Sequence, residues 1–235
     1  MIHGIVCDMD DTLYDEREYV RSGFSVVARV VGHSDQQTAD LAAWLWAAFE
    51  AGIRGDTFDL LRAAFPDAGD RFSTGDLVDI YRTHVPSITL APGVPETLDR
   101  LHRLGQRLGV LSDGPVASQA AKATALSLKR WFDPILLTGS FGPTFAKPGT
   151  AGFEAIALGW GIQAEELAYI ADNPQKDFVG PRKLGWRTIR ILHPRQLHYG
   201  LEPVDDDHRA DVVIDSPADL LRVLPGLSDR QIMTL

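Results

Sequence analysis

Predicted strands and helices alternate along the chain from Pro92 onward, and this alternation constrains the fold more than any other feature of the sequence. Short apolar runs rich in valine, isoleucine and leucine stand between longer segments in which apolar residues have a helical spacing. Such alternation is typical of βαβ units, so we expect a parallel sheet with helices on both of its faces. The expected strands are 107–111, 135–138, 167–171, 187–192 and 212–214, and the expected helices are 96–104, a segment from 116 onward, 150–158, 175–184 and 218–224.

One more strand is expected near the beginning of the sequence, and it ends in acids. Residues 5–7 are all apolar, which is typical of a parallel strand buried on both faces, and Asp8, Asp10 and Asp11 follow. Buried carboxylates are costly without partners, and ligands of open α/β sheets bind at the carboxyl ends of the strands. Acids with this spacing more often do no more than start a turn. The choice between a turn and a ligand site therefore depends on the residues at the ends of the other strands.

The segment between the first strand and the alternating region, residues 15–90, has the pattern of several consecutive helices. The run from Pro92 to Pro95, which also contains glycine, marks its end. We therefore expect an α/β protein with a doubly wound parallel sheet. Its core domain would comprise residues 1–14 and 91–235, and residues 15–90 would form an inserted α-helical domain over the carboxyl ends of the strands.

Composition narrows the classes of partner. The formal net charge of −9 disfavours binding to nucleic acid or to an anionic membrane, because both need a basic surface. No stretch approaches the roughly 20 apolar residues of a membrane span. The single cysteine, Cys7, cannot form an intrachain disulfide, which fits a reducing compartment. We therefore expect a cytoplasmic protein, either a monomer or a homodimer, without a nucleic-acid or membrane partner.

Polar residues recur at the points where the later strands end. Each has an ordinary explanation when taken alone: a helix cap for a serine, a solvated surface for a lysine, and a helix start for an acid. Together, at one edge of one sheet, they indicate a functional site. These residues are Ser112, Asp113 and Gly114 after one strand, Lys147 before a helix, and Asp172, Asn173 and Asp177 after another strand.

In this order the residues resemble the four motifs of the haloacid dehalogenase-like (HAD) hydrolase superfamily. The motifs are residues 8–12, Ser112, Lys147 and residues 172–177, and the first and the fourth are the specific ones. The resemblance extends from residue 5 to about residue 180. It implies a Rossmann-like core with the first strand in the centre, and it identifies the helical insertion as that family's α-helical cap, in the position called C1.

The chemistry of a phosphate ester suggests a role for each acid. A phosphate monoester repels a carboxylate nucleophile, and Mg²⁺, a hard ion that takes oxygen ligands, offsets this repulsion. Asp8 and Asp172 would supply carboxylate ligands, and the resemblance adds the backbone carbonyl of Asp10. Asp8 would attack phosphorus and form an aspartyl-phosphate. Asp10 would act first as general acid toward the leaving oxygen and then as general base toward water.

The other motif residues would bind or orient the phosphoryl group. Ser112 would bind phosphoryl oxygens and Lys147 would balance their charge. Asp177 would hold Lys147 or a metal-bound water, and Asn173 would lie near the metal. Further residues are expected to contact the substrate. Some of them could instead bond only to the backbone or lie on a solvated helix face. These are Thr12, Asp113, Gly114, Tyr14, Arg17 and Arg21.

Two features discriminate between branches of the superfamily. Dehalogenases lack the second acid of the first motif, whereas Asp10 is present here. Phosphonatases use a lysine of the cap, and this chain has no lysine from Met1 to Ala121. A phosphatase is therefore favoured, while a phosphomutase and a catalytically silent binding protein stay open. A receiver-like signalling domain is disfavoured, because it would be about half this length and would lack the insertion.

The substrate expected for a capped site is a small, soluble phosphorylated metabolite. Sugar phosphates, nucleoside monophosphates and phosphoglycolate all fit. One connection is unusually long, between the expected strands 187–192 and 212–214. It leaves the carboxyl end of a strand, so it could line the rim of the pocket or a dimer contact, or it could be an acidic surface loop.

Overall fold

The computed structural model describes residues 1–224, which form two compact units. The core combines Met1–Arg17 with the chain from Thr89 onward, and the helical unit is Glu18–Ile88. The chain thus leaves the core soon after its first strand and returns before its second. Among the described residues, the structure contains no helix with both the length and the apolar character that a membrane span requires.

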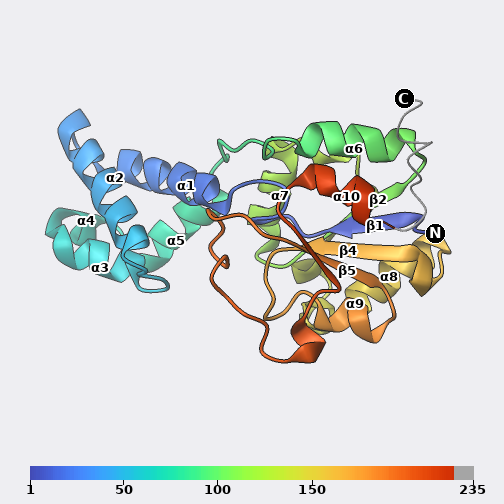
Figure 1. The fold of residues 1–235 in the computed structure, drawn as a ribbon. Helices are drawn as coiled ribbons and strands as arrows, with labels where there is room; N and C mark the ends of the chain where they lie inside the picture. Colours follow the sequence, from blue (N-terminus) through green and yellow to red (C-terminus); the bar gives the residue numbers. More distant parts are fainter. Residues whose placement is uncertain (225–235) are drawn as a thin grey trace. The chain divides into compact units, whose positions relative to one another are not determined.

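The core is built on a parallel sheet whose strand order, in the described residues, is β3-β2-β1-β4-β5-β6 (Figure 1). Strand β1 lies in the middle, and Cys7 at its end pairs with Val110 on one side and with Ile170 on the other. This is the strand order of Rossmann folds, so the predicted fold class is confirmed. The strands are β1 (Gly4–Cys7), β2 (Arg107–Ser112), β3 (Ile135–Leu137), β4 (Leu167–Ala171), β5 (Arg187–Ile191) and β6 (Val212–Ile214).

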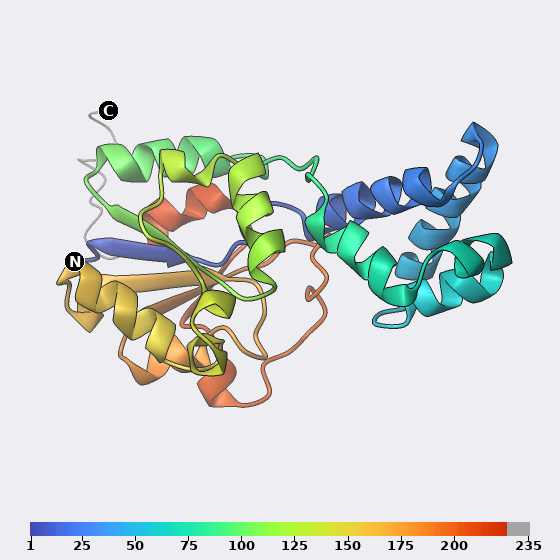
Figure 2. The same ribbon diagram turned by 180° about the vertical axis from the view of Figure 1, so that it is seen from behind.

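Helices cover both faces of this sheet. Helices α6 and α10 lie on one face, and α8 and α9 lie on the other (Figure 1). Figure 2 shows these layers from behind, with the green α6 above the sheet and the yellow α8 below it. The arrangement follows from right-handed crossovers that run in opposite directions from the central strand. The helices are α6 (Val94–Arg103), α7 (Val116–Ala125), α8 (Ala151–Trp160), α9 (Val179–Lys183) and α10 (Leu220–Val223).

An aromatic cluster joins α8 to the sheet. Phe153 of α8 packs edge-on against Tyr169 of β4, with ring centroids 4.8 Å apart, and against Trp186, at 5.5 Å. All three side chains are buried, together with Val6 and Leu111 of the neighbouring strands. This packing fixes the position of β4, whose carboxyl end carries polar residues of the candidate site.

The helix predicted for residues 175–184 is shorter than expected. It begins only at Val179, because side chains upstream bond to the backbone and form a turn instead. Asn173 Oδ1 accepts the N–H of Gln175 at 2.9 Å, and Asp177 Oδ2 accepts the N–H of Asn173, also at 2.9 Å. The last predicted helix likewise begins as a 3₁₀ turn, Pro217–Asp219, before α10.

The helical unit contains the helices predicted between the first and second strands. Ser34 caps α2 by accepting the N–H of Gln37 at 3.2 Å, and Ser73 forms a capping box with Asp76 at the start of α5. Phe24 lies edge-on to both Phe49 and Phe58 in its interior. The helices are α1 (Glu16–Val31), α2 (Asp35–Glu50), α3 (Thr57–Ala64), α4 (Pro66–Arg71) and α5 (Thr74–Thr83).

A glycine lets α9 approach the loop that follows Lys147. A Cβ atom at Gly180 would lie 2.8 Å from the carbonyl oxygen of Gly149 and 3.0 Å from that of Pro148. We expect Gly180→Ala to lower the free energy of unfolding by about 1–3 kcal/mol, since the backbone must move. Gly159→Ala is the control, because a Cβ atom there meets nothing within 4 Å in α8.

The measurement is urea unfolding of both variants and the wild type. The control should be unchanged or more stable by about 0.5–1 kcal/mol, because alanine is the better helix former. Equal stability of the two variants would show that the close contact at Gly180 is unimportant.

Candidate active site

The carboxyl edge of the sheet brings together three of the residues predicted from the sequence. Asp8 follows β1, and its backbone N–H donates to the carbonyl of Ile170 at 2.8 Å. Ser112 is the last residue of β2, and Asp172 follows β4. All of these residues are buried. Because β2 and β4 flank β1, the three polar side chains come from adjacent strands at a single edge.

Lys147 lies inside this group of residues. Its Nζ is 2.7 Å from Asp8 Oδ1, 2.7 Å from Asp177 Oδ1 and 3.0 Å from the hydroxyl of Tyr169. The side chains of Lys147 and Asp177 are fully buried. Burial alone would lower the pKa of Lys147, but the charges of Asp177 and Asp8 raise it well above its usual value. Lys147 is therefore a permanent positive charge beside the predicted nucleophile.

The site carries more negative charge than Lys147 can balance. One carboxylate oxygen from each of Asp8, Asp172 and Asp177 lies within 4.8 Å of the others, and all three residues are buried. Burial raises the pKa of Asp8 to about 7 although Lys147 opposes the shift, and burial also raises the pKa of Asp172. Clustered, desolvated carboxylates form a set of hard oxygen donors. Such a set fits a divalent cation such as Mg²⁺.

Asp10, the second acid of the first motif, has three partners. Tyr14 donates its hydroxyl to Oδ1 at 2.5 Å, Lys122 Nζ lies 2.7 Å from the same oxygen, and Gln119 Nε2 donates to Oδ2 at 2.8 Å. Burial alone would raise the pKa of Asp10, but the charge and hydrogen bond of Lys122, with the bonds from Tyr14 and Gln119, lower it. Asp10 is thus held in one orientation.

Gln119 and Lys122 were not predicted from the sequence. Gln119 Nε2 also lies 2.6 Å from the hydroxyl of Ser112, so one amide connects a phosphate-binding candidate with Asp10. Both residues lie on α7, and only 1% of Gln119 and 4% of Lys122 is exposed. One sequence feature could have indicated them: they are three residues apart on the helix that follows Ser112, so their side chains lie on the same helix face.

Two further motif residues hold the loops in place. Asp113 Oδ1 accepts the hydroxyl of Thr138 at 2.8 Å and the backbone N–H of Lys147 at 3.3 Å, which ties the end of β2 to the lysine loop. Asn173 shapes the turn after β4 through its bonds to neighbouring residues. Gly114 lies against Gln119 with a φ of +134°, a conformation that glycine tolerates best.

The residues predicted to contact substrate lie in different surroundings. Tyr14 is in the site through Asp10, and Arg17 donates from Nε to the carbonyl of Arg195 at 2.9 Å. The Thr12 hydroxyl is buried beside a small, mainly apolar cavity and has no hydrogen-bond partner in residues 1–224. Arg21 belongs to the helical unit, where its guanidinium stacks 4.1 Å from the ring of Trp46. Direct substrate contact by these residues stays a prediction.

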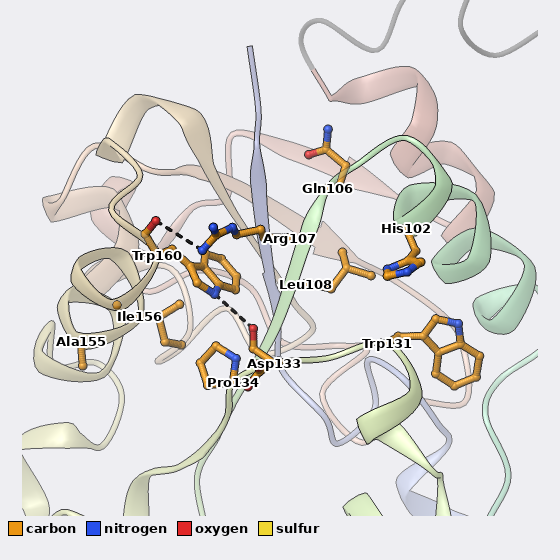
Figure 3. Close-up of a pocket in the computed structure, with 11 residues that line it drawn as sticks. His102, Gln106, Arg107, Leu108, Trp131, Asp133, Pro134, Ala155, Ile156 and Trp160 are labelled. Carbon is orange, nitrogen blue, oxygen red and sulfur yellow. Dashed lines mark hydrogen bonds between the residues drawn. The ribbon is translucent and has the colours of Figure 1, made fainter.

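A surface hollow lies at the opposite edge of the sheet (Figure 3). Arg107, at the beginning of β2, lines it, and so do Trp131 and Trp160. The ring N–H of Trp160 donates to the carbonyl of Asp133 at 3.1 Å, as the dashed line shows. Because the hollow adjoins the amino end of β2, it is separate from the site at Asp8.

A model of the haloacid dehalogenase-like hydrolases matches residues 2–185 of the chain. The chain belongs to this family. The predicted family is therefore confirmed, on a match that includes all four motifs.

Relatives with curated names match nearly the whole chain. A glyceraldehyde 3-phosphate phosphatase of Methanocaldococcus jannaschii is 26% identical over 241 aligned positions, which cover 97% of this chain and 99% of the relative. A glyceraldehyde 3-phosphate phosphatase of Methanopyrus kandleri is 27% identical, with the same coverage of 97% and 99%. These relatives confirm the prediction of an enzyme of the phosphatase branch.

Solved structures support the fold. The HAD hydrolase YfnB of Bacillus subtilis superposes with a TM-score of 0.65 at 18% identity, covering 95% of this chain and 99% of that one. The L-2-haloacid dehalogenase of Xanthobacter autotrophicus gives a TM-score of 0.62, also at 18% identity, and covers 97% of this chain and 100% of its own. At such low sequence identity, the two structures support the fold and nothing beyond it.

The buried acids predict how stability depends on pH in the absence of metal. The pKa of Asp8 is raised from 3.8 to about 7 in the folded protein. The protonated form of Asp8 therefore stabilises the fold fully below the pKa that Asp8 has in the unfolded chain. This stabilisation is lost as pH rises through about 7. The pKa values of Asp11 and Glu16 are also raised, to about 6 and about 8. The free energy of unfolding in EDTA should therefore fall between about pH 5 and about pH 7.5, by a few kcal/mol.

Urea titrations of the wild type and of Asp8→Asn at both pH values measure this dependence. The variant keeps a neutral side chain at position 8, so its free energy of unfolding should fall less with rising pH, though it should still fall. A wild-type stability that rises over this range in EDTA would contradict the assigned direction.

Proposed function

We propose that this chain is a Mg²⁺-dependent phosphomonoester hydrolase that acts through an aspartyl-phosphate on Asp8. The observation that carries the proposal is the arrangement around that residue. Asp8 directly follows the central strand, Lys147 Nζ lies 2.7 Å from its carboxylate, and two further buried carboxylates lie within 4.8 Å. A carboxylate nucleophile with an adjacent cation and a set of metal ligands suits phosphoryl transfer.

Each residue of the site has its own part in the proposed reaction. Asp8 attacks phosphorus, and the leaving oxygen departs with the proton that Asp10 carries when this step begins and that the second step restores. Lys147 stays paired with Asp8 and balances the charge of the transferring group. Asp8, Asp172 and the backbone carbonyl of Asp10 would hold Mg²⁺, which when bound neutralises charge on the phosphoryl oxygens. In the second step Asp10 accepts a proton from the water that attacks the phosphoryl group on Asp8.

Ser112 supplies a hydrogen bond to a phosphoryl oxygen in this proposal. Its hydroxyl is buried and is already oriented by Gln119 at 2.6 Å. Because the same amide bonds to Asp10, the phosphate-binding group and the proton-transfer group are held at a fixed separation. Such positioning reduces the reorganisation that the reaction requires.

The names of the relatives suggest a short phosphorylated aldehyde as the first substrate to test. Both nearly full-length relatives are named for glyceraldehyde 3-phosphate. We therefore propose a phosphorylated sugar of three or a few more carbons, with nucleoside monophosphates and phosphoglycolate as competing substrates. The relatives share about a quarter of their residues with this chain, so the substrate has to be measured.

The test is a screen for phosphate release over these metabolites with Mg²⁺. The wild type should release phosphate, and Asp8→Asn should lose activity by about 10³-fold or more while keeping its fold by circular dichroism. Isomerisation of a sugar phosphate without free phosphate would indicate a phosphomutase. No turnover of any phosphate ester would indicate a silent binding protein.

Lys122 gives a second prediction about the same reaction. Lys122→Met removes the charge that lowers the pKa of Asp10, so Asp10 would lose its proton only at higher pH. We expect kcat to fall by about 10- to 100-fold near neutral pH, with a smaller effect on KM, because general base catalysis weakens. The acidic limb of the pH–rate profile should move to higher pH.

Two variants control for other effects. Lys122→Arg keeps the positive charge and should leave the acidic limb near its wild-type position. Lys129→Met removes an exposed lysine just beyond α7 and should leave the profile unchanged. A Lys122→Met profile that coincides with the wild type would show that Lys122 does not control Asp10.

A further inference from the structure

The long connection between β5 and β6 lies against the first motif. Gln196 is buried, and its Nε2 donates to the backbone carbonyl of Asp11 at 2.6 Å and to that of Ile191 at 3.2 Å. The backbone N–H of Leu197 donates to Asp11 Oδ2 at 2.6 Å. We call His193–Tyr199 the β5 segment. Its buried hydrogen bonds attach it to the loop that follows Asp8 and Asp10.

Exposed contacts add to these buried bonds. Arg195 Nε lies 2.7 Å from Asp15 Oδ2, and the carbonyl of Arg195 accepts the Nε–H of Arg17 at 2.9 Å. The side chain of Arg195 is 66% exposed, so this pair is screened by solvent and contributes little to stability. The buried bonds of Gln196 and the partly buried bond of Leu197 therefore determine where the segment lies.

The β5 segment also reaches the acid at the end of β4. His198 Nδ1 lies 3.0 Å from Asp172 Oδ2. Arg190 of β5 joins the backbones of the same two residues: Nε donates to the carbonyl of Asp172 at 3.0 Å, and Nη2 donates to the carbonyl of His198 at 3.1 Å. The guanidinium thus fixes the two main chains relative to each other, and the His198 ring is placed beside the carboxylate.

We propose that His198 is a positioning residue for the metal site, which holds the Asp172 carboxylate in the orientation that binds a divalent cation. The inference rests on the proposed function, because it concerns the cation that the proposed reaction needs. The Nδ1–H of His198 occupies one carboxylate oxygen, and Arg190 fixes the backbone of the same residue. A ligand restrained at both ends loses less freedom when the cation binds.

This role differs from those of the four motifs. His198 comes after the last motif, and it acts on the metal site through Asp172. Sequence spacing gives no hint of it, because 25 residues separate the two positions in the chain. Residues that orient a metal ligand typically change metal affinity by about 10- to 100-fold when they are removed. The same range is expected for His198.

The experiment is calorimetric titration of Mg²⁺ into metal-free protein without substrate. His198→Ala should weaken Mg²⁺ affinity by about 10- to 100-fold. In His198→Asn, the amide Nδ2 takes the place of the ring Nδ1, so the affinity should stay within a few-fold of the wild type. Tyr199→Ala is the matched control, since this neighbouring ring is half exposed, and its affinity should not change.

Each outcome has a definite meaning. If the wild type and His198→Ala bind Mg²⁺ equally, the positioning role is wrong and the proposed function is untouched. If the wild type binds no Mg²⁺, the proposed metal-dependent reaction fails as well. If His198→Asn is as weak as His198→Ala, the Nδ1 hydrogen bond is not the cause. Should His198→Ala not fold, His198→Gln replaces it, because its amide extends too far to reproduce the contact.

Discussion

The buried pairing of Lys147 with two carboxylates is the interaction on which the site depends. A charge removed from water is tolerated only with partners of opposite charge and good geometry, and Lys147 meets both Asp8 and Asp177 at 2.7 Å. One carboxylate oxygen of Asp172 lies within 4.8 Å of those of Asp8 and Asp177, so the site holds three acids against one lysine. An excess of acids suits the divalent cation and the anionic substrate that we propose for this site.

The strand order of the fold produces this arrangement. A parallel sheet with β1 in the middle places the ends of three strands side by side. One polar residue of the site stands at or directly after the end of each of these strands. Aromatic packing of Phe153 on Tyr169 then fixes the strand from which the tyrosine hydroxyl reaches Lys147. Gly180 permits the helix after the fourth motif to approach the lysine loop. Core packing and the chemistry of the site are therefore parts of the same structure.

Much of this could be predicted from the sequence, and the reason is local. Residues 5–7 are apolar and Asp8 follows them, so a strand and the acid at its end can be read within a few positions. The contacts of Lys122 and Gln196 could not be found in this way. A lysine on a helix is usually solvated, and a glutamine in a long connection is usually a loop residue. Only tertiary structure shows that both are buried and bonded near Asp10 and Asp11.

The helix predicted from residue 175 failed for a related reason. Apolar spacing favoured a helix, but the side chains of Asn173 and Asp177 bond to the nearby backbone and form a turn. That turn is what allows Asp177 to face Lys147 while Asp172 stays at the strand end. The departure from regular structure therefore lies where the function requires it.

We propose that the carboxylates at the sheet edge form one cation site. Titration of Mg²⁺ into Asp172→Asn, with the wild type alongside, tests it most directly. We expect a single saturable site in the wild type, with binding lost in the variant, since a neutral amide is a poor ligand for a hard cation. Equal binding by both proteins would place the cation elsewhere and contradict a site at these carboxylates.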